Sequence, residues 1–365
     1  MSDEFIREII SISDPALLRE WFVRRCDQFD LAVVRAIKEW IDEVNRAEPR
    51  RALALAEAGL AAAEACSNPT ARAWMLWARG HAQMQLEEYQ AGLASCDAAL
   101  ALLRSQGDAH TAARVEVSRL FALVNLGREE AVIRSSDAIR AALEQYDDQY
   151  ALARLEMNMG IAYDNTDRHG QALQCFESAA ARFEALGRPL EVLRARINSA
   201  IALENLDRYD DALAVYTEIR PALVALDKPM VLARNDFNMA VLHFWLGDYA
   251  RALGEFEAAR RAFSRLNVSA EMDQVDLYRA LLYLELNQFS EVIATCSEVE
   301  RRASERGIIR DVILAKWFAA VACLTGNPRS EKRSRDRLAR GRAWSGRPLS
   351  SRSRAMSKSI RATWR

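Results

Sequence analysis

The sequence predicts an all-α protein, a right-handed α-solenoid of about seven helix pairs of equal length. Three observations support this fold class. Similar residues recur at every fortieth position, which is typical of a repeat array with one helix pair in each period. The sequence includes only 14 Gly and 8 Pro, too few for the turns of a β-sandwich or barrel. Strand-like apolar runs are missing, which argues against a doubly wound α/β enzyme.

The repeat is visible in columns of residues that are 40 positions apart. One column is mostly small and contains Gly80, Leu120, Gly160, Ala200, Ala240 and Ala280. Another contains residues that readily end helices: Gly107, Asp147, Gly187, Asp227, Asn267 and Gly307. The columns continue without an insertion, so chance does not explain them.

Each unit is expected to contain two amphipathic helices, called helix A and helix B. In the unit 153–192, helix A is expected from Ala153 to Asn165 and helix B from Gly170 to Leu186, with the turn at Asp167-Arg168. Small residues at 160, 172 and 179 allow the two helices to approach closely. One pair cannot bury its apolar face alone, so neighbouring pairs must stack.

These residues resemble the tetratricopeptide repeat (TPR) family. The family pattern of small, aromatic, small and small residues is met by Ala240, Tyr249, Ala252 and Ala259. The resemblance covers about 33–326, although the unit has 40 residues rather than the usual 34 or so. It implies an array over 33–327, preceded by an N-terminal helical cap at 1–32 in which Asp14-Pro15 starts a helix.

A narrower resemblance is to the TPR region of bacterial CHAT-domain (caspase-like) proteins. It depends on the 40-residue units and on phrases such as ARLEMNMGIAY and LGDYARALGEFEAARRAF. In that family the array precedes a peptidase domain, which this sequence does not contain. The resemblance therefore implies a sensor or regulatory role in a CHAT-type protease system, and no peptidase role can be carried over from it.

A basic Arg/Ser-rich segment follows the array at 328–365. From residue 329 onward, 13 Lys and Arg face only Glu331 and Asp336, a net charge of +11, so residues 1–328 carry −12. Two interpretations remain open: a disordered tail that contacts nucleic acid or acidic partners, or a reading-frame slip in a longer gene. Either way an eighth unit lacks its second helix, which predicts an exposed apolar edge near Ile313, Trp317 and Leu324.

No pattern of a catalytic, metal or cofactor site is present, so the protein is expected not to be an enzyme. The four His residues have no zinc-ligand spacing, and His169 and His243 fit packing columns. The six Cys are widely spaced and are expected to be free thiols, with Cys96 and Cys296 in the core. No signal peptide or membrane helix is found, which predicts a cytoplasmic protein with no membrane contact.

The candidate binding residues lie on one face of helix A, called the inner stripe. Counting repeat position 1 at residues 33, 73, 113, 153, 193, 233 and 273, the stripe consists of positions 2, 6, 9 and 13, whose spacing places them on one helix face. Position 9 is apolar. The polar members are Arg114, Arg154, Arg194 and Arg234 at position 2, Ser118, Asn158, Asn198 and Asn238 at position 6, and Asn125, Asn165 and Asn205 at position 13, followed there by Trp245.

Two interpretations of the inner stripe remain open. Asn amides pair with a peptide N–H and C=O together, and the TPR resemblance implies an asparagine ladder of Asn158, Asn198 and Asn238 in a concave groove. The Arg column suits carboxylates of a partner. Alternatively, the Asn and Arg side chains tie neighbouring helices together, and Trp245 is a core residue.

The leading hypothesis is a non-catalytic scaffold that binds a peptide or protein segment of unknown identity. A second hypothesis is the ligand-sensing TPR module of a transcriptional regulator, and a third is nucleic-acid contact through the basic tail. The sequence leaves the partner and self-association undetermined.

Overall fold

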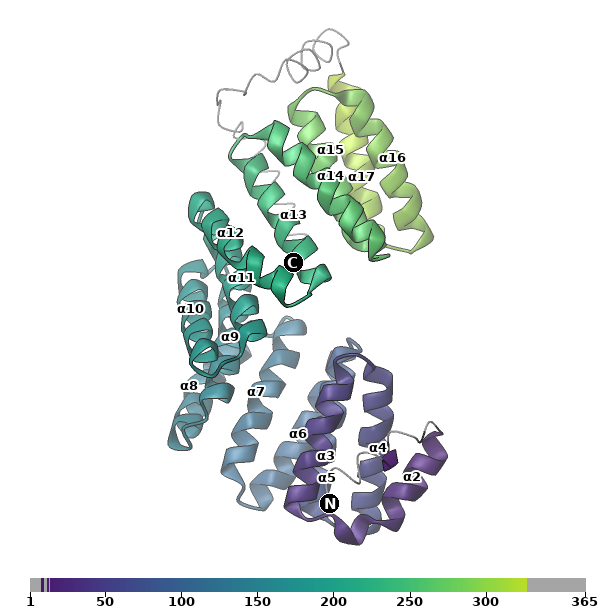
Figure 1. Ribbon diagram of the computed structural model, residues 1–365, viewed down its shortest axis with the longest axis vertical. Coiled ribbons are helices and arrows are strands. Elements are labelled where there is room, and N and C mark those ends of the chain that lie inside the picture. The colour runs from purple at the N-terminus through teal and green to yellow at the C-terminus, as the bar shows by residue number, and fades with distance from the viewer. Residues whose placement is uncertain (1–7, 10–11, 13, 327–365) are drawn as a thin grey trace. The chain divides into compact units, whose positions relative to one another are not determined.

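The computed structural model describes residues 8–9, 12 and 14–326, and these form helices without a strand (Figure 1). The tail predicted at 328–365 lies outside the described residues. The helices are α2 (Pro15–Arg24), η1 (Cys26–Gln28), α3 (Leu31–Asn45), α4 (Pro49–Ala65), α5 (Pro69–Gln85), α6 (Tyr89–Ser105), α7 (Ala109–Asn125), α8 (Glu129–Gln145), α9 (Gln149–Asn165), α10 (His169–Ala185), α11 (Pro189–Asn205), α12 (Tyr209–Ala225), α13 (Pro229–Trp245), α14 (Tyr249–Arg265), α15 (Ser269–Glu285), α16 (Phe289–Glu305) and α17 (Ile309–Thr325).

The predicted all-α fold and the predicted seven helix pairs are confirmed. Helices α3 to α16 form seven sequential pairs in which the odd-numbered member is helix A and the even-numbered member is helix B. Helix α17 is the helix A of an eighth unit. From α4 onward all helices have the same length and so do all connections, so the chain reverses direction twice within each repeat.

The connections share one geometry, which explains the spacing of the turn residues. After α9, the Asp167 N–H donates to the carbonyl of Asp164 at 3.2 Å, and the Arg168 N–H donates to that of Tyr163 at 2.8 Å. These are the two hydrogen bonds of a Schellman motif, and they require a left-handed residue at Asp167, whose φ is 59°. The same left-handed position recurs in every connection from α4 to α17, at Ser67, Glu87, Gly107, Gly127, Asp147, Asp167, Gly187, Asp207, Asp227, Gly247, Asn267, Asn287 and Gly307.

Helix A begins one turn earlier than the sequence predicts. Helix α9 starts at Gln149 rather than Ala153, because Asp148 accepts a hydrogen bond from the Ala151 N–H at 2.9 Å and so caps the helix. Asp108 caps α7 in the same way through the Thr111 N–H at 3.0 Å. One short connection therefore ends one helix and caps the next.

The chain divides into two compact units, residues 1–195 and 196–365, and the boundary falls within α11. In the first unit, successive helices A pack on one another as α3–α5, α5–α7 and α7–α9, besides the packing within pairs. In the second unit, α13–α15 and α15–α17 repeat this arrangement. Each unit thus has a layer of helices A that places the inner-stripe residues of neighbouring repeats side by side.

Small residues let the two helices of a pair approach closely, as the repeat columns predict. The clearest case is Gly160 in α9, where a Cβ atom would lie 2.5 Å from the nearest ring atom of Phe176 in α10. Phe176 is buried, and so is the small residue Ala172 in the same helix. Helices α9 and α10 can therefore pack at this distance only because residue 160 has no side chain.

We expect Gly160→Ala to destabilise the first unit. Alanine favours a helix over glycine by about 1 kcal/mol, but forcing a methyl group against a buried ring costs typically about 1–3 kcal/mol. Urea unfolding monitored by hydrogen exchange in α9 and α10 measures the net loss. Gly170→Ala is the matched control, because a Cβ there meets no atom within 4 Å and should not destabilise the unit.

Helix α2 of the N-terminal segment packs on the first pair. Asp14 accepts a hydrogen bond from the Ala16 N–H at 2.8 Å, so α2 begins at the predicted Asp14-Pro15 step. Helix α2 packs on α4, and its Phe22 is fully buried with its ring edge-to-face against Phe29, 5.9 Å between centroids.

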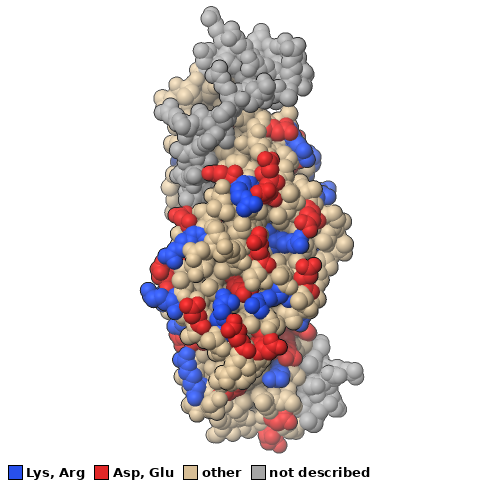
Figure 2. All heavy atoms as spheres, turned by 90° about the vertical axis from the view of Figure 1, so that its left-hand side faces the viewer, with Lys and Arg blue, Asp and Glu red and all other residues tan. Residues whose placement is uncertain are grey.

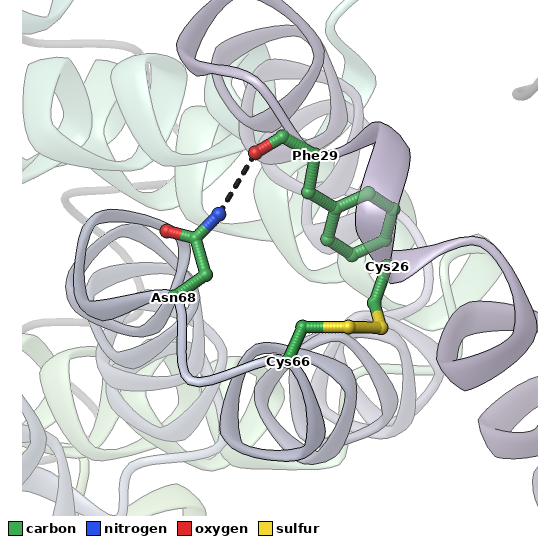
Figure 3. The surroundings of a disulfide bond; sticks show 4 residues. All are labelled: Cys26, Phe29, Cys66 and Asn68. Atoms are coloured by element: carbon green, nitrogen blue, oxygen red, sulfur yellow. Dashed lines mark hydrogen bonds between the residues drawn. A yellow bond between two sulfur atoms is a disulfide. The ribbon is translucent and has the colours of Figure 1, made fainter.

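The expectation that all six cysteines are free thiols is wrong for two of them. A disulfide joins Cys26 in η1 to Cys66 at the end of α4, with the Cα atoms 6.0 Å apart (Figure 3). This separation is ordinary for a disulfide. Cys96 and Cys296 are free and fully buried, as predicted, and burial raises the pKa of each thiol to about 12.

Helix α17 leaves the predicted apolar edge uncovered by described residues. The exposed fractions of Ile313, Trp317 and Leu324 are 61%, 42% and 88%.

Among the described residues, no helix is long and apolar enough to cross a lipid bilayer.

Candidate functional site

The asparagines at repeat position 6 are largely occupied by contacts inside the protein. Asn158 is buried and donates a hydrogen bond from its side-chain amide to the Val117 carbonyl in α7 at 2.9 Å. Asn238 donates to the Tyr216 hydroxyl in α12 at 3.1 Å. Asn198 is half-buried and makes no hydrogen bond to any described residue. Of the three ladder residues, Asn198 is therefore the one whose amide is available.

The asparagine side chains at position 13 also form hydrogen bonds within the protein. Asn125 donates to the Phe121 carbonyl one turn earlier in its own helix at 2.8 Å, and Asn165 donates to the Glu129 carboxylate in α8 at 3.1 Å. Asn205 is half-buried. Trp245 is buried, with its ring 4.6 Å from that of Phe244 between centroids, which matches the packing interpretation of this residue.

The arginines at position 2 fall into two groups. Arg114 lies 3.5 Å from the Asp148 carboxylate, and Arg234 forms an ion pair with Glu271 at 2.7 Å. Arg154 is half-buried and Arg194 is exposed, and neither forms a hydrogen bond or ion pair with any described residue. Arg154 is the more unusual of the two, because a charged group that is removed from water normally forms an ion pair or hydrogen bonds.

A buried polar network in the first unit extends the inner stripe towards the N-terminus. Lys38 in α3 pairs with Asp42 at 2.5 Å, and the other carboxylate oxygen of Asp42 faces His81 Nδ1 in α5 at 2.9 Å. His81 Nε2 lies 2.8 Å from the Ser118 hydroxyl of α7, to which Trp77 donates its indole N–H at 2.9 Å. The network therefore joins three successive helices A.

The order of Asp42, His81 and Ser118 is that of an acid–base–hydroxyl triad. Chemistry at Ser118 would need access for a substrate, yet its exposed fraction is 0%. Its oxygen also accepts the Trp77 hydrogen bond. These contacts make the network a means of joining helices rather than a nucleophilic site.

Burial and charge shift the pKa values in this network. Burial lowers the pKa of His81 to about 4, against the opposing effect of Asp42, and the charges of Lys38 and Arg154 lower it further. Burial likewise lowers the pKa of Lys38, with Arg154 and Arg114 contributing. Burial alone would raise the pKa of Asp42, but His81 and Lys38 hold it well below its usual range. Arg154 therefore lies within electrostatic reach of the network.

No protein-family model and no curated protein matches the sequence, but solved structures do match the fold. A STAND signal-transduction ATPase with a tetratricopeptide repeat sensor, from Pyrococcus horikoshii, aligns over 92% of this chain with a TM-score of 0.66 and 13% identity. The alignment covers 50% of that protein, so this chain spans half of its length. The chain therefore has a TPR-like fold.

Two further structures share this TPR-like fold. Aspartyl phosphate phosphatase F from Bacillus subtilis aligns over 86% of this chain and 85% of its own, with a TM-score of 0.56 and 14% identity. NprR in complex with its cognate peptide NprX aligns over 98% and 97%, with a TM-score of 0.50 and 13% identity. At these identities the likeness establishes the fold.

The TPR-like repeat contains a second polar feature, at position 4 of helix A. In four repeats a charged residue there pairs with an opposite charge in the preceding helix B, at the same separation along the chain. The pairs are Arg140–Glu156 at 3.0 Å, Arg220–Asp236 at 2.7 Å, Arg260–Asp276 at 2.9 Å and Glu300–Lys316 at 3.3 Å. The last pair has its charges exchanged, which indicates that the pairing itself is the common feature.

Two of these pairs are reinforced by an arginine in the following helix B. Arg182 reaches Glu156 at 3.2 Å, and Arg302 reaches Asp276 at 2.6 Å. The side-chain exposures of Glu156 and Asp276 are 4% and 3%, so each carboxylate is buried among arginines. Such a carboxylate joins two helices B across one helix A of the TPR-like array.

The sequence contained signals for the network and for the ion pairs. Lys38 occupies position 6 and His81 occupies position 9, so extending the inner stripe by two repeats would have found them. The ion pairs would have required a comparison of the charge at position 4 with the charges of the preceding helix B. On the face drawn in Figure 2, described Lys and Arg residues are interspersed with Asp and Glu, so composition does not reveal the pairing.

The other histidines also contact acidic side chains. His169 Nδ1 lies 2.7 Å from Asp164, and buried His243 lies 2.6 Å from Glu255. Within the described ranges, no three His, Cys, Asp or Glu side chains gather closely enough to hold a metal ion.

Proposed function

We propose that this TPR-like array is the peptide-sensing module of a larger regulatory system. It would bind an extended, acidic peptide or protein segment along the inner stripe of the first unit. The observation that carries this proposal is the half-buried Arg154, which has no partner among the described residues and lies beside the Lys38–His81 network. A ligand carboxylate would supply the missing partner through a charge-assisted hydrogen bond.

Two of the structural neighbours support a sensing role. NprR is described in complex with its cognate peptide, and its fold covers nearly all of this chain. The STAND ATPase has a TPR sensor, and this chain spans half of that protein's length. A sensor for a separate or attached effector therefore fits better than an isolated scaffold.

The finer alternatives remain proposals. The neighbours reported above include no CHAT-domain protein, so a CHAT-type effector depends on the sequence resemblance alone. One neighbour is named as a phosphatase, so the fold itself is compatible with catalysis. Nucleic-acid contact would depend on residues 328–365, outside the described part of the chain.

A random peptide library selected on the full chain tests the proposal, followed by fluorescence anisotropy with the selected peptides. We expect acidic peptides to be enriched. Arg154→Ala should weaken their binding by about 10- to 100-fold, since a hydrogen bond to a charged group contributes roughly 1.5–3 kcal/mol.

Arg261→Ala is the matched control, because Arg261 is exposed on α14 and forms no hydrogen bond or ion pair with a described residue. It should leave affinity unchanged. The proposal is wrong if no peptide is selected, or if Arg154→Ala binds as tightly as the native chain while remaining folded.

A further inference from the structure

The Cys26–Cys66 disulfide lies at a junction that positions α3. It closes a loop that contains the whole of α3 and α4. Cys66 is the C-cap residue of α4, and shortly after it Asn68 caps α5 by accepting a hydrogen bond from the Ala71 N–H at 3.0 Å. One short connection thus ends α4, begins α5 and is bonded to η1.

A side-chain hydrogen bond also links these segments at the same junction. The side-chain amide of Asn68 donates a hydrogen bond to the Phe29 carbonyl at 2.9 Å, beside the disulfide (Figure 3). Phe29 lies directly before Asp30, which caps α3 through the Val33 N–H at 2.8 Å. The segment that precedes α3 is therefore joined to the connection before α5 by the disulfide and by this hydrogen bond.

Further along, α3 is held to α5 through the polar network of the inner stripe. Lys38 and Asp42 belong to α3, whereas His81 and Trp77 belong to α5. Asp42 faces His81 at 2.9 Å, and the Lys38 ammonium lies 3.7 Å from the centre of the Trp77 ring. Loosening the start of α3 therefore acts on the polar network that lies within electrostatic reach of Arg154.

The two sulfur-bearing residues differ in their access to solvent. Cys66 is exposed and Cys26 is buried. Two of the free cysteines are poor competitors for thiol chemistry, because burial raises the pKa of Cys96 and Cys296 to about 12. A dissolved thiol therefore reaches this pair through Cys66.

We propose that Cys26–Cys66 is a thiol–disulfide switch that controls the inner stripe by fixing or releasing α3. A low-molecular-weight thiol reduces the Cys26–Cys66 bond, and the corresponding small disulfide re-forms it. The oxidised protein holds α3 against α5 and presents the Lys38–Asp42–His81 cluster in one arrangement. The reduced protein keeps the hydrogen bond of Asn68 but loses the covalent link. The effect on ligand affinity rests on the proposed function, whereas the effect on α3 does not.

The exchange reaction conserves atoms and electrons. A thiolate attacks the sulfur of Cys66, the S–S bond breaks, and Cys26 leaves as a thiolate that takes up a proton. A second thiol attacks the mixed disulfide and releases Cys66 as a thiol. Two small thiols become one small disulfide, and the protein gains two electrons and two protons.

The full chain, oxidised or reduced in glutathione buffers, tests the switch by thiol counting and hydrogen exchange. We expect two more titratable thiols after reduction and exchange in α3 that is at least about tenfold faster, with α9 and α10 unchanged. Cys26→Ser with Cys66→Ser should exchange like the reduced chain in every buffer. Cys323→Ser, which removes an exposed free thiol, should respond like the native chain.

Three results would overturn the switch: six titratable thiols in the unreduced, denatured chain, equal exchange of α3 in both states, or equal affinity of both states for a peptide that binds. Binding of no peptide in either state would overturn the proposed function instead, and the exchange of α3 would still decide the switch.

Discussion

Replacing Asp276 by alanine should lower the free energy of unfolding of the second unit by about 3–5 kcal/mol. The Asp276 side chain is 3% exposed and accepts from Arg260 at 2.9 Å, Arg279 at 2.8 Å and Arg302 at 2.6 Å. Its removal leaves these guanidinium groups partly buried without this carboxylate. Urea unfolding followed by hydrogen exchange in α15 and α16 measures the loss separately from the first unit.

The preceding repeat supplies the matched control. Asp236 occupies the same repeat position and pairs with Arg220 at the same spacing, but its side chain is 30% exposed and that of Arg220 is 47% exposed. Asp236→Ala should therefore cost about 1 kcal/mol or less. Equal losses for Asp276→Ala and Asp236→Ala would contradict the view that burial sets the strength of these ion pairs.

The second large effect is a loss of stability of the first unit in mild acid. Burial lowers the pKa of His81 from 6.5 to about 4, so between these values the unfolded chain binds a proton that the folded chain does not. Stability is full above about pH 6.5 and falls as the pH drops towards 4. The shift corresponds to about 3 kcal/mol, at about 1.36 kcal/mol for each pKa unit.

Urea unfolding of α5 and α7, followed by hydrogen exchange at about pH 7 and about pH 4.5, measures this loss. His81→Gln should remove most of the dependence between those values. His110→Gln, at another histidine that faces an aspartate, should leave it in place. Asp42 acts in the same direction at lower pH, because its depressed pKa stabilises the fold above about pH 4 and is lost below. A flat profile in the native chain would refute the buried neutral His81.

The repeat could be predicted from the sequence because its packing constraints are local and periodic. Gly160 must be small because Phe176 lies against it, and Asp167 must tolerate a left-handed backbone, so both kinds of position recur. The helix start was misplaced by a turn because Asp148 caps α9 before its apolar pattern begins.

The candidate site was less predictable because its contacts join residues about one repeat apart. Asn158 fits a ligand-binding column by spacing, but only the structure shows its amide turned to the Val117 carbonyl. Cys26 and Cys66 are also one repeat apart. Their spacing in the sequence does not indicate that they form a disulfide. The network around His81 was not predicted because Lys38 and His81 lie in the two repeats that precede the Asn and Arg columns, so those columns do not include them.

The constant helix and connection lengths have a consequence for how such a chain can change. Removing residues 149–188 would join Asp148 to Pro189, so a left-handed residue and a helix cap would again precede a helix A. Removing half a repeat would reverse the chain direction and exchange the two kinds of helix, and other lengths would place a left-handed residue inside a helix. Recombination can therefore lengthen or shorten this protein only in steps of one whole pair, which preserves every remaining junction.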